Sequence, residues 1–161
     1  MTRHILAVVL SILMIGQTSA QEWATAVSKH KTEDRAIVYR FVKSFAPNFD
    51  RSTQPDRVIL VWNYESDSGM PSVEEREMMD KLEDSLSPTI EGGGFATLAL
   101  VSTGENSREW IYYARSEDEF MGRLNAALKG SPAYPIEIHA ARDPTWSTYE
   151  EFVSGLVGGH G

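Results

Sequence analysis

Acidic side chains crowd one short stretch of this chain, and paired carboxylates can act as acid and base when their surroundings separate their pKa values. Ser72 and Glu75 have the Ser-x-x-Glu spacing of a helix start, and apolar residues follow at helical spacing. The pattern predicts a helix over residues 73–87, which Pro88 ends or kinks. We therefore expect a solvated helix face rather than a catalytic pair. The carboxylates concerned are Glu74, Glu75, Glu77, Asp80, Glu83 and Asp84.

His139 is the other candidate for acid–base or metal chemistry. It follows Glu137 by two residues in the alternating segment 135–141, so both side chains share one face of a predicted strand. A zinc site needs three or four converging ligands, so this pair predicts no metal site, and no cofactor is expected. The chain has no cysteine nucleophile. A hydrolase-type enzyme using carboxylates with His139 stays an alternative.

Aromatic residues form a third group, and aromatic side chains supply large contact areas at binding surfaces. If residues 95–102 and 109–115 pair as a hairpin, alternation gives this hairpin two distinct faces. We expect the helices to meet the face that carries Leu98, Leu100, Ile111 and Tyr113. The opposite face is expected to carry the candidate ligand- or partner-binding residues Trp62, Trp110, Tyr112 and His139. Alternatively, the N-terminal hairpin or the C-terminal helix covers that face and makes it core.

The elements that must position these residues follow the order strand, helix, strand, strand, helix, strand. This order is typical of the split βαβ, or ferredoxin-like, arrangement, an antiparallel sheet with two helices on one face. The sequence thus predicts an α+β fold, preceded by an N-terminal β-hairpin and followed by a short C-terminal helix. The predicted strands are residues 23–28, 36–45, 58–64, 95–102, 109–115 and 135–141. The second helix carries Phe120 to Leu128, and Trp146, Tyr149, Phe152 and Val153 of the last helix are expected to pack inward.

The first twenty residues have the pattern of a secretory signal peptide. A basic start is followed by the apolar run ILAVVLSILMI and by small residues that end at Ala20. The run is too short to span a bilayer, which takes about 20 apolar residues. We expect residues 1–20 to be removed, residues 21–157 to form one domain and residues 158–161 to be a flexible tail. The sequence therefore predicts an exported bacterial protein, periplasmic or secreted.

The charge balance narrows the range of partners. The formal net charge is −8, and loss of residues 1–20 removes one arginine and no acid. Because phosphate backbones and anionic lipids attract basic surfaces, neither nucleic acid nor a membrane is an expected partner after signal cleavage. A protein or a small ligand remains as the expected partner, and the sequence leaves the oligomeric state open.

Several segments resemble the bacterial family called domain of unknown function 695 (DUF695). They are residues 69–75 (GMPSVEE), 82–84 (LED), 108–113 (REWIYY), 134–137 (YPIE) and 143–146 (DPTW), with Tyr149 and Phe152. The resemblance implies a small α/β domain and supplies no catalytic residues. A more distant likeness to the ribonuclease E inhibitor family of the B type implies a protein-binding role.

These observations together favour a non-enzymatic domain that binds a protein or a small ligand. Two alternatives remain open at this stage. One is the hydrolase-type enzyme built on carboxylates and His139. The other is an inhibitor of a partner enzyme, which the family likeness implies.

Overall fold

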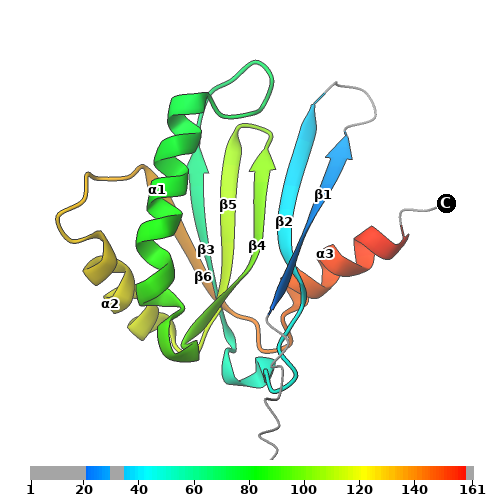
Figure 1. Ribbon diagram of the computed structural model, residues 1–161, viewed down its shortest axis with the longest axis vertical. Helices are drawn as coiled ribbons and strands as arrows, with labels where there is room; N and C mark the ends of the chain where they lie inside the picture. The colour runs from blue at the N-terminus through cyan, green and yellow to red at the C-terminus, as the bar shows by residue number, and fades with distance from the viewer. Residues whose placement is uncertain (1–20, 30–34, 159–161) are drawn as a thin grey trace, which may run out of the picture.

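The computed structural model describes residues 21–29 and 35–158, which form one antiparallel sheet with three helices (Figure 1). The predicted α+β class is confirmed. The sheet has six strands in the order β1-β2-β4-β5-β3-β6. Its strands are β1 (Glu22–Lys29), β2 (Ala36–Ser44), β3 (Asp56–Asn63), β4 (Ala96–Gly104), β5 (Ser107–Ala114) and β6 (Ile136–Arg142). The helices are α1 (Val73–Ile90), α2 (Glu117–Leu128) and α3 (Ser147–Gly158), with short 3-10 turns at Arg51–Thr53 and Gly92–Gly94.

The N-terminal hairpin extends the sheet. Strand β2 pairs antiparallel with β4, and β1 pairs antiparallel with β2, so β1 forms one edge of the sheet and β6 the other. Within residues 21–29 and 35–158, no helix is both long and apolar enough to cross a bilayer. The predicted signal peptide and the last three residues of the predicted tail lie outside the described residues.

The helices divide between the two faces of the sheet. Helices α1 and α2 pack on the face of Leu60, Trp110 and Tyr112, where the larger core cluster forms. Helix α3 packs on the opposite face, where Ile111 and Tyr113 join a second, aromatic cluster. The expected face assignment is therefore wrong for the β5 residues, because α1 and α2 cover the side predicted to be open.

A β-bulge in β4 explains part of that error. The pairing between β4 and β5 shifts between Leu98 and Leu100, so Leu98 lies opposite Tyr112 while Leu100 lies opposite Ile111. An extra residue in one strand interrupts simple alternation, and Leu98 and Leu100 consequently belong to different core clusters. The Glu91 carboxylate receives the Leu98 N–H at 3.0 Å, which satisfies a backbone donor beside the irregularity.

Local signals fixed the helix starts but not the end of α1. The Ser72 side chain accepts the backbone N–H of Glu75, as the predicted helix start requires. Ser116 and Glu119 have the same Ser-x-x-Glu spacing, and the Ser116 side chain accepts the Glu119 N–H at the start of α2. Pro88 neither ends α1 at residue 87 nor prevents a further turn, because the helix continues to Ile90. Only the final turn follows the proline, and the fully buried Ile90 holds that turn in the core.

Candidate functional site

A groove lies beside α1, where the sheet extends beyond the helix. Figure 1 shows α1 and α2 in front of one half of the sheet, while no helix lies in front of the β1–β2 hairpin. The groove has a volume of about 490 Å³. Its lining comes from α1 and from strands β1, β2, β4 and β5: Thr25, Val38, Arg40, Asp80, Glu83, Asp84, Val101, Thr103 and Arg108.

Strand register builds the groove floor. Thr25 lies opposite Arg40, Arg40 opposite Val101, and Val101 opposite Trp110. Directly opposite residues point to the same side of a sheet, so this row runs from the open groove into the core under α1. A second row, Val38–Thr103–Arg108, lies beside it.

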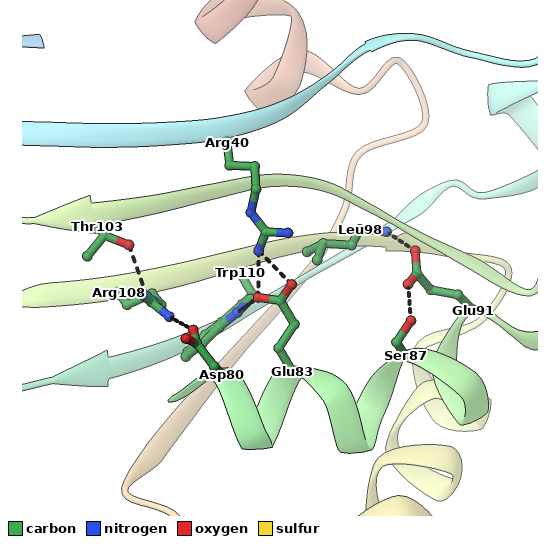
Figure 2. Close-up of polar contacts among 9 residues, drawn as sticks. All are labelled: Arg40, Asp80, Glu83, Ser87, Glu91, Leu98, Thr103, Arg108 and Trp110. Carbon is green, nitrogen blue, oxygen red and sulfur yellow. Dashed lines mark hydrogen bonds and ion pairs between the residues drawn. The ribbon is translucent and has the colours of Figure 1, made fainter. Parts of the chain in front are cut away.

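Glu83 is the centre of the groove's polar contacts (Figure 2). One nitrogen of the Arg40 guanidinium donates to both carboxylate oxygens, at 2.5 and 2.6 Å. The Trp110 indole N–H donates to Oε2 at 2.8 Å. The Glu83 side chain is only 18% exposed, so an unpaired carboxylate here would be costly. The two donors, one from each of two strands, fix the direction of the carboxylate.

Arg108 forms the second part of the same network. Its Nε donates to Thr103 Oγ1 at 2.9 Å and its Nη1 to Asp80 Oδ1 at 2.8 Å (Figure 2). The Arg108 side chain is 10% exposed, whereas Asp80 is 59% exposed. The guanidinium thus lies under the groove surface and anchors a carboxylate that faces solvent. We call Arg40, Asp80, Glu83, Arg108 and Trp110 the groove network.

Two ion pairs hold the charged side chains of the groove network in place, Arg40 with Glu83 and Arg108 with Asp80. Two guanidinium groups and three carboxylates line the groove, so its formal charge is negative. Val38 and Val101 add apolar floor between them. Such a surface suits recognition of a ligand that brings positive charge and some apolar surface. Among residues 21–29 and 35–158, no three His, Asp or Glu side chains gather as a metal site.

The predicted aromatic face is not an open surface. Trp62, Trp110 and Tyr112 are almost fully buried in the core under α1 and α2. Burial raises the pKa of the Tyr112 hydroxyl strongly, and the Glu91 and Glu83 carboxylates add to the shift. The expected exposure of these three residues is therefore wrong, because the helices pack on this face rather than on the other. Trp110 still reaches the groove through its indole N–H.

His139 lies apart from those aromatic residues. It pairs with Ile59, whereas Ile138 pairs with Leu60, so His139 points to the α3 side of the sheet. Its Nε2 is 3.4 Å from a Glu137 carboxylate oxygen, and both side chains are exposed. The predicted pairing of Glu137 and His139 on one strand face is confirmed. Their predicted place beside Trp110 is wrong.

The sequence did not predict the groove, although Asp80, Glu83 and Asp84 were among its candidate carboxylates. The acidic residues were interpreted as a solvated helix face, but Glu83 turns toward the sheet and is mostly buried. One signal was present: Arg40 and Arg108 are charged residues within apolar, aromatic strand segments (AIVYRFV and REWIYY). Charged side chains in such positions are rarely buried unless paired, which predicts carboxylate partners without identifying them.

A second polar network lies on the opposite face of β5 and fastens α3. The Asp143 carboxylate accepts the Ser147 N–H at 2.8 Å, the Thr148 N–H at 3.2 Å and the Tyr113 hydroxyl at 2.8 Å. Burial tends to raise the pKa of Asp143, but the hydrogen bonds from Ser147, Tyr113 and Thr148 outweigh it and lower the pKa. Trp146 stacks on Tyr113 with 4.1 Å between ring centroids. We call Tyr113, Asp143, Ser147 and Thr148 the α3 network.

The fold and the groove define a small α+β domain with an antiparallel sheet and a charged groove at its side. A model of a family of unknown function (DUF695) matches residues 21–154, and the chain belongs to that family. No curated protein and no solved structure matches the chain. The more distant likeness to the ribonuclease E inhibitor family is not among these matches. The segments that carried the DUF695 resemblance contribute to both networks, including Glu83, Arg108 and Trp110 in the groove and Asp143 under α3.

Proposed function

We propose that this protein is a non-enzymatic binding module and that its ligand lies in the groove between α1 and the β1–β2 hairpin. The observation that carries the proposal is the contact set of Glu83. Its carboxylate receives Arg40 and Trp110 donors from two different strands while lining an open groove. A carboxylate held in this way points in a fixed direction, and both of its oxygens already accept hydrogen bonds. Fixed, complementary charge favours recognition.

The occupant we propose is a basic segment of a partner protein. The α1 wall supplies Asp80, Glu83 and Asp84, and the whole chain has a formal net charge of −8. A lysine or arginine side chain brings positive charge to this wall and an apolar stem to Val38 and Val101. Long-range attraction also speeds the encounter of a basic partner with an acidic protein.

Two further features belong to the same proposal. The order β4-β5-β3-β6, with α1 after β3 and α2 after β5, supports a split βαβ, ferredoxin-like unit to which the β1–β2 hairpin is added. The family match begins at residue 21, directly after the predicted signal peptide, which supports export of the chain from residue 21 onward, with residues 21–157 as a single domain. N-terminal sequencing of the protein recovered from the periplasm or medium tests this, and an intact Met1 would contradict it.

Peptide binding tests the groove directly. The chain from Gln21 onward is titrated with short basic, acidic and uncharged peptides, and affinity is followed by fluorescence anisotropy. Basic peptides are expected to bind best. Substitution of both Asp80 and Asp84 by asparagine should weaken that binding about tenfold, equivalent to about 1.4 kcal/mol.

The matched control changes the same charge elsewhere on the same helix. Glu74 and Glu77 lie on α1 and do not line the groove. Replacing both with glutamine should leave peptide affinity within about twofold, because their effect on the groove is screened by solvent and salt. Equal losses in the two double variants would show attraction to net charge alone and overturn the groove assignment. Equal binding of acidic peptides would overturn the ligand class.

A further inference from the structure

Strand β1 is an edge that lacks the usual protection against pairing. Between Glu22 and Lys29 its sequence is WATAVS, with no charged residue. Trp23 is 38% exposed and Val27 is 58% exposed, and both lie on the groove side of the strand. An edge segment of six uncharged residues with exposed apolar side chains is a template for another strand.

The opposite edge of the sheet shows the contrast. Strand β6 carries Glu137, His139 and Arg142, and these three side chains are largely exposed. Charges along an edge discourage a second strand from pairing with it. Because β1 carries no such charge along its middle, it is the edge on which two copies of an acidic protein can approach each other most easily.

We propose that two copies of this protein pair through their β1 strands, antiparallel and with Thr25 opposite Thr25 of the second copy. A two-fold axis perpendicular to the sheet keeps each face on its own side, so residues whose numbers sum to 50 lie opposite one another. Trp23 of each copy then lies opposite Val27 of the other. Aromatic and β-branched residues make favourable cross-strand pairs, so this register pairs the exposed apolar side chains of β1 with each other.

Pairing in this register also joins the two grooves. The row Arg40–Thr25 on the groove face continues into Thr25 and Arg40 of the second copy. Each groove keeps its own α1 wall, and the two hairpins form a shared floor between these walls. On the other face, α3 runs out past β1 (Figure 1), and Val157 near its end is 80% exposed. In the pair, this end of α3 lies beside the second copy.

Sedimentation velocity of the chain from Gln21 onward tests the pairing. The protein should sediment as a dimer at about 100 μM and dissociate on dilution, as expected for a micromolar dissociation constant. Val27→Lys should raise that constant at least about tenfold, because the lysine faces Trp23 of the second copy twice per dimer. Met78→Lys changes another exposed apolar side chain, on α1, and should leave the dimer intact.

A cysteine trap tests the register. The natural chain has no cysteine, so Thr25→Cys introduces a single thiol that the proposed pairing places opposite its symmetry mate. Opposite Cα atoms in antiparallel strands are about 4.5–5.5 Å apart, which a disulfide can bridge. Under mild oxidation this variant should form a covalent dimer. Lys29→Cys, four residues from the two-fold axis, should not.

Three results would overturn the proposal. One is a monomer at every concentration, which would leave β1 to a different partner or to none. Another is a dimer that Val27→Lys does not weaken while its circular dichroism shows a native fold. The third is equal cross-linking of the Thr25→Cys and Lys29→Cys variants, which would indicate random collision rather than a defined register.

Discussion

Strand β5 carries one polar network on each face, and the two differ in their access to solvent. On the α1 side, Arg108 and Trp110 reach the groove network, whose outer members Arg40 and Asp80 are about half exposed. On the α3 side, Tyr113 donates to Asp143, and both residues are buried. Each network contains a carboxylate that accepts several N–H or O–H groups. Only one of them lies in a groove.

This difference in solvent access implies different roles: the buried α3 network stabilises the fold, and the groove network also forms part of a surface that a ligand can contact. A closed, fully satisfied network specifies how elements pack, because any rearrangement leaves a buried polar group unpaired. The α3 network meets this description, since it ties the start of α3 to β5. One end of the groove network, at Trp110, is buried and closed to solvent, whereas the other end, at Arg40 and Asp80, is open to solvent. Variants at its closed end should therefore change stability, and variants at its open end should change binding.

The largest expected effect is at the closed end of the groove network. Trp110→Ala removes a buried indole from the core under α1 and leaves Glu83 without its core donor. We expect the free energy of unfolding to fall by about 3–5 kcal/mol, as for other buried tryptophans. Urea denaturation followed by circular dichroism measures it. Trp23→Ala is the control on the same face of the sheet, and a similar loss there would contradict the distinction between covered and open regions.

The next effect breaks the α3 network. Asp143→Ala leaves the Tyr113 hydroxyl and two backbone N–H groups at the start of α3 without their acceptor. Losing a helix cap costs about 1 kcal/mol, and a buried unpaired donor costs about 1–3 kcal/mol. We expect a total loss of about 2–4 kcal/mol in the free energy of unfolding, with peptide binding in the groove unchanged. A loss of binding without a loss of stability would reverse the roles of the two networks.

The pH dependence of stability should follow Asp143. Its pKa in the folded protein lies below its usual value, so folding favours the ionised form. The resulting stabilisation is present at neutral pH and is lost as the pH falls below about 4, toward the lowered pKa. Urea titrations between neutral and acid pH should show the wild type and Asp143→Asn converging in unfolding free energy as the pH falls. A constant difference between them would contradict this assignment.

Local structure could be predicted from the sequence, but which face of the sheet α1 and α2 cover could not. Capping boxes at Ser72 and Ser116 and the alternating strands are local signals, and they placed the helix starts and the sheet strands within a few residues. Which face receives α1 and α2 depends on packing between distant segments, and here both faces of β5 are aromatic or apolar. Sequence alone gave no physical reason to prefer the face of Trp110 over that of Tyr113.

The groove was harder to predict because it exists only through long-range pairing. Arg40, Glu83 and Arg108 come from β2, α1 and β5. Arg40 and Arg108 are charges within apolar strand segments, but nothing in the sequence distinguishes Glu83 from its acidic neighbours as their partner. The β2–β4 pairing brings Arg40 beside Val101, and α1 then places Glu83 above them. The spacing of these residues along the chain does not indicate that they lie close together in the fold. The resemblance to a family nevertheless drew on residues 82–84 and 108–113, which contain two of the three.

The smallest expected change in stability comes from the open end of the groove network. Arg40→Gln removes an ion pair whose arginine is 43% exposed, and the Trp110 N–H still pairs the Glu83 carboxylate. The free energy of unfolding should therefore fall by only about 1 kcal/mol. Binding should respond in the opposite sense. With one positive charge gone, the groove is more negative and Glu83 is available to the ligand, so affinity for a basic peptide should rise about fivefold, or about 1 kcal/mol.

Arg142→Gln is the matched control for that change, because Arg142 also forms a surface ion pair, with Asp56 at 3.3 Å, but lies on the β6 edge. It should leave peptide affinity within about twofold, since solvent and salt screen a charge at that distance. A fall in affinity in Arg40→Gln alone would mean that the guanidinium itself binds the ligand. The groove would then recognise a carboxylate or phosphate, and its proposed preference for basic segments would be wrong even though its place beside α1 would stand.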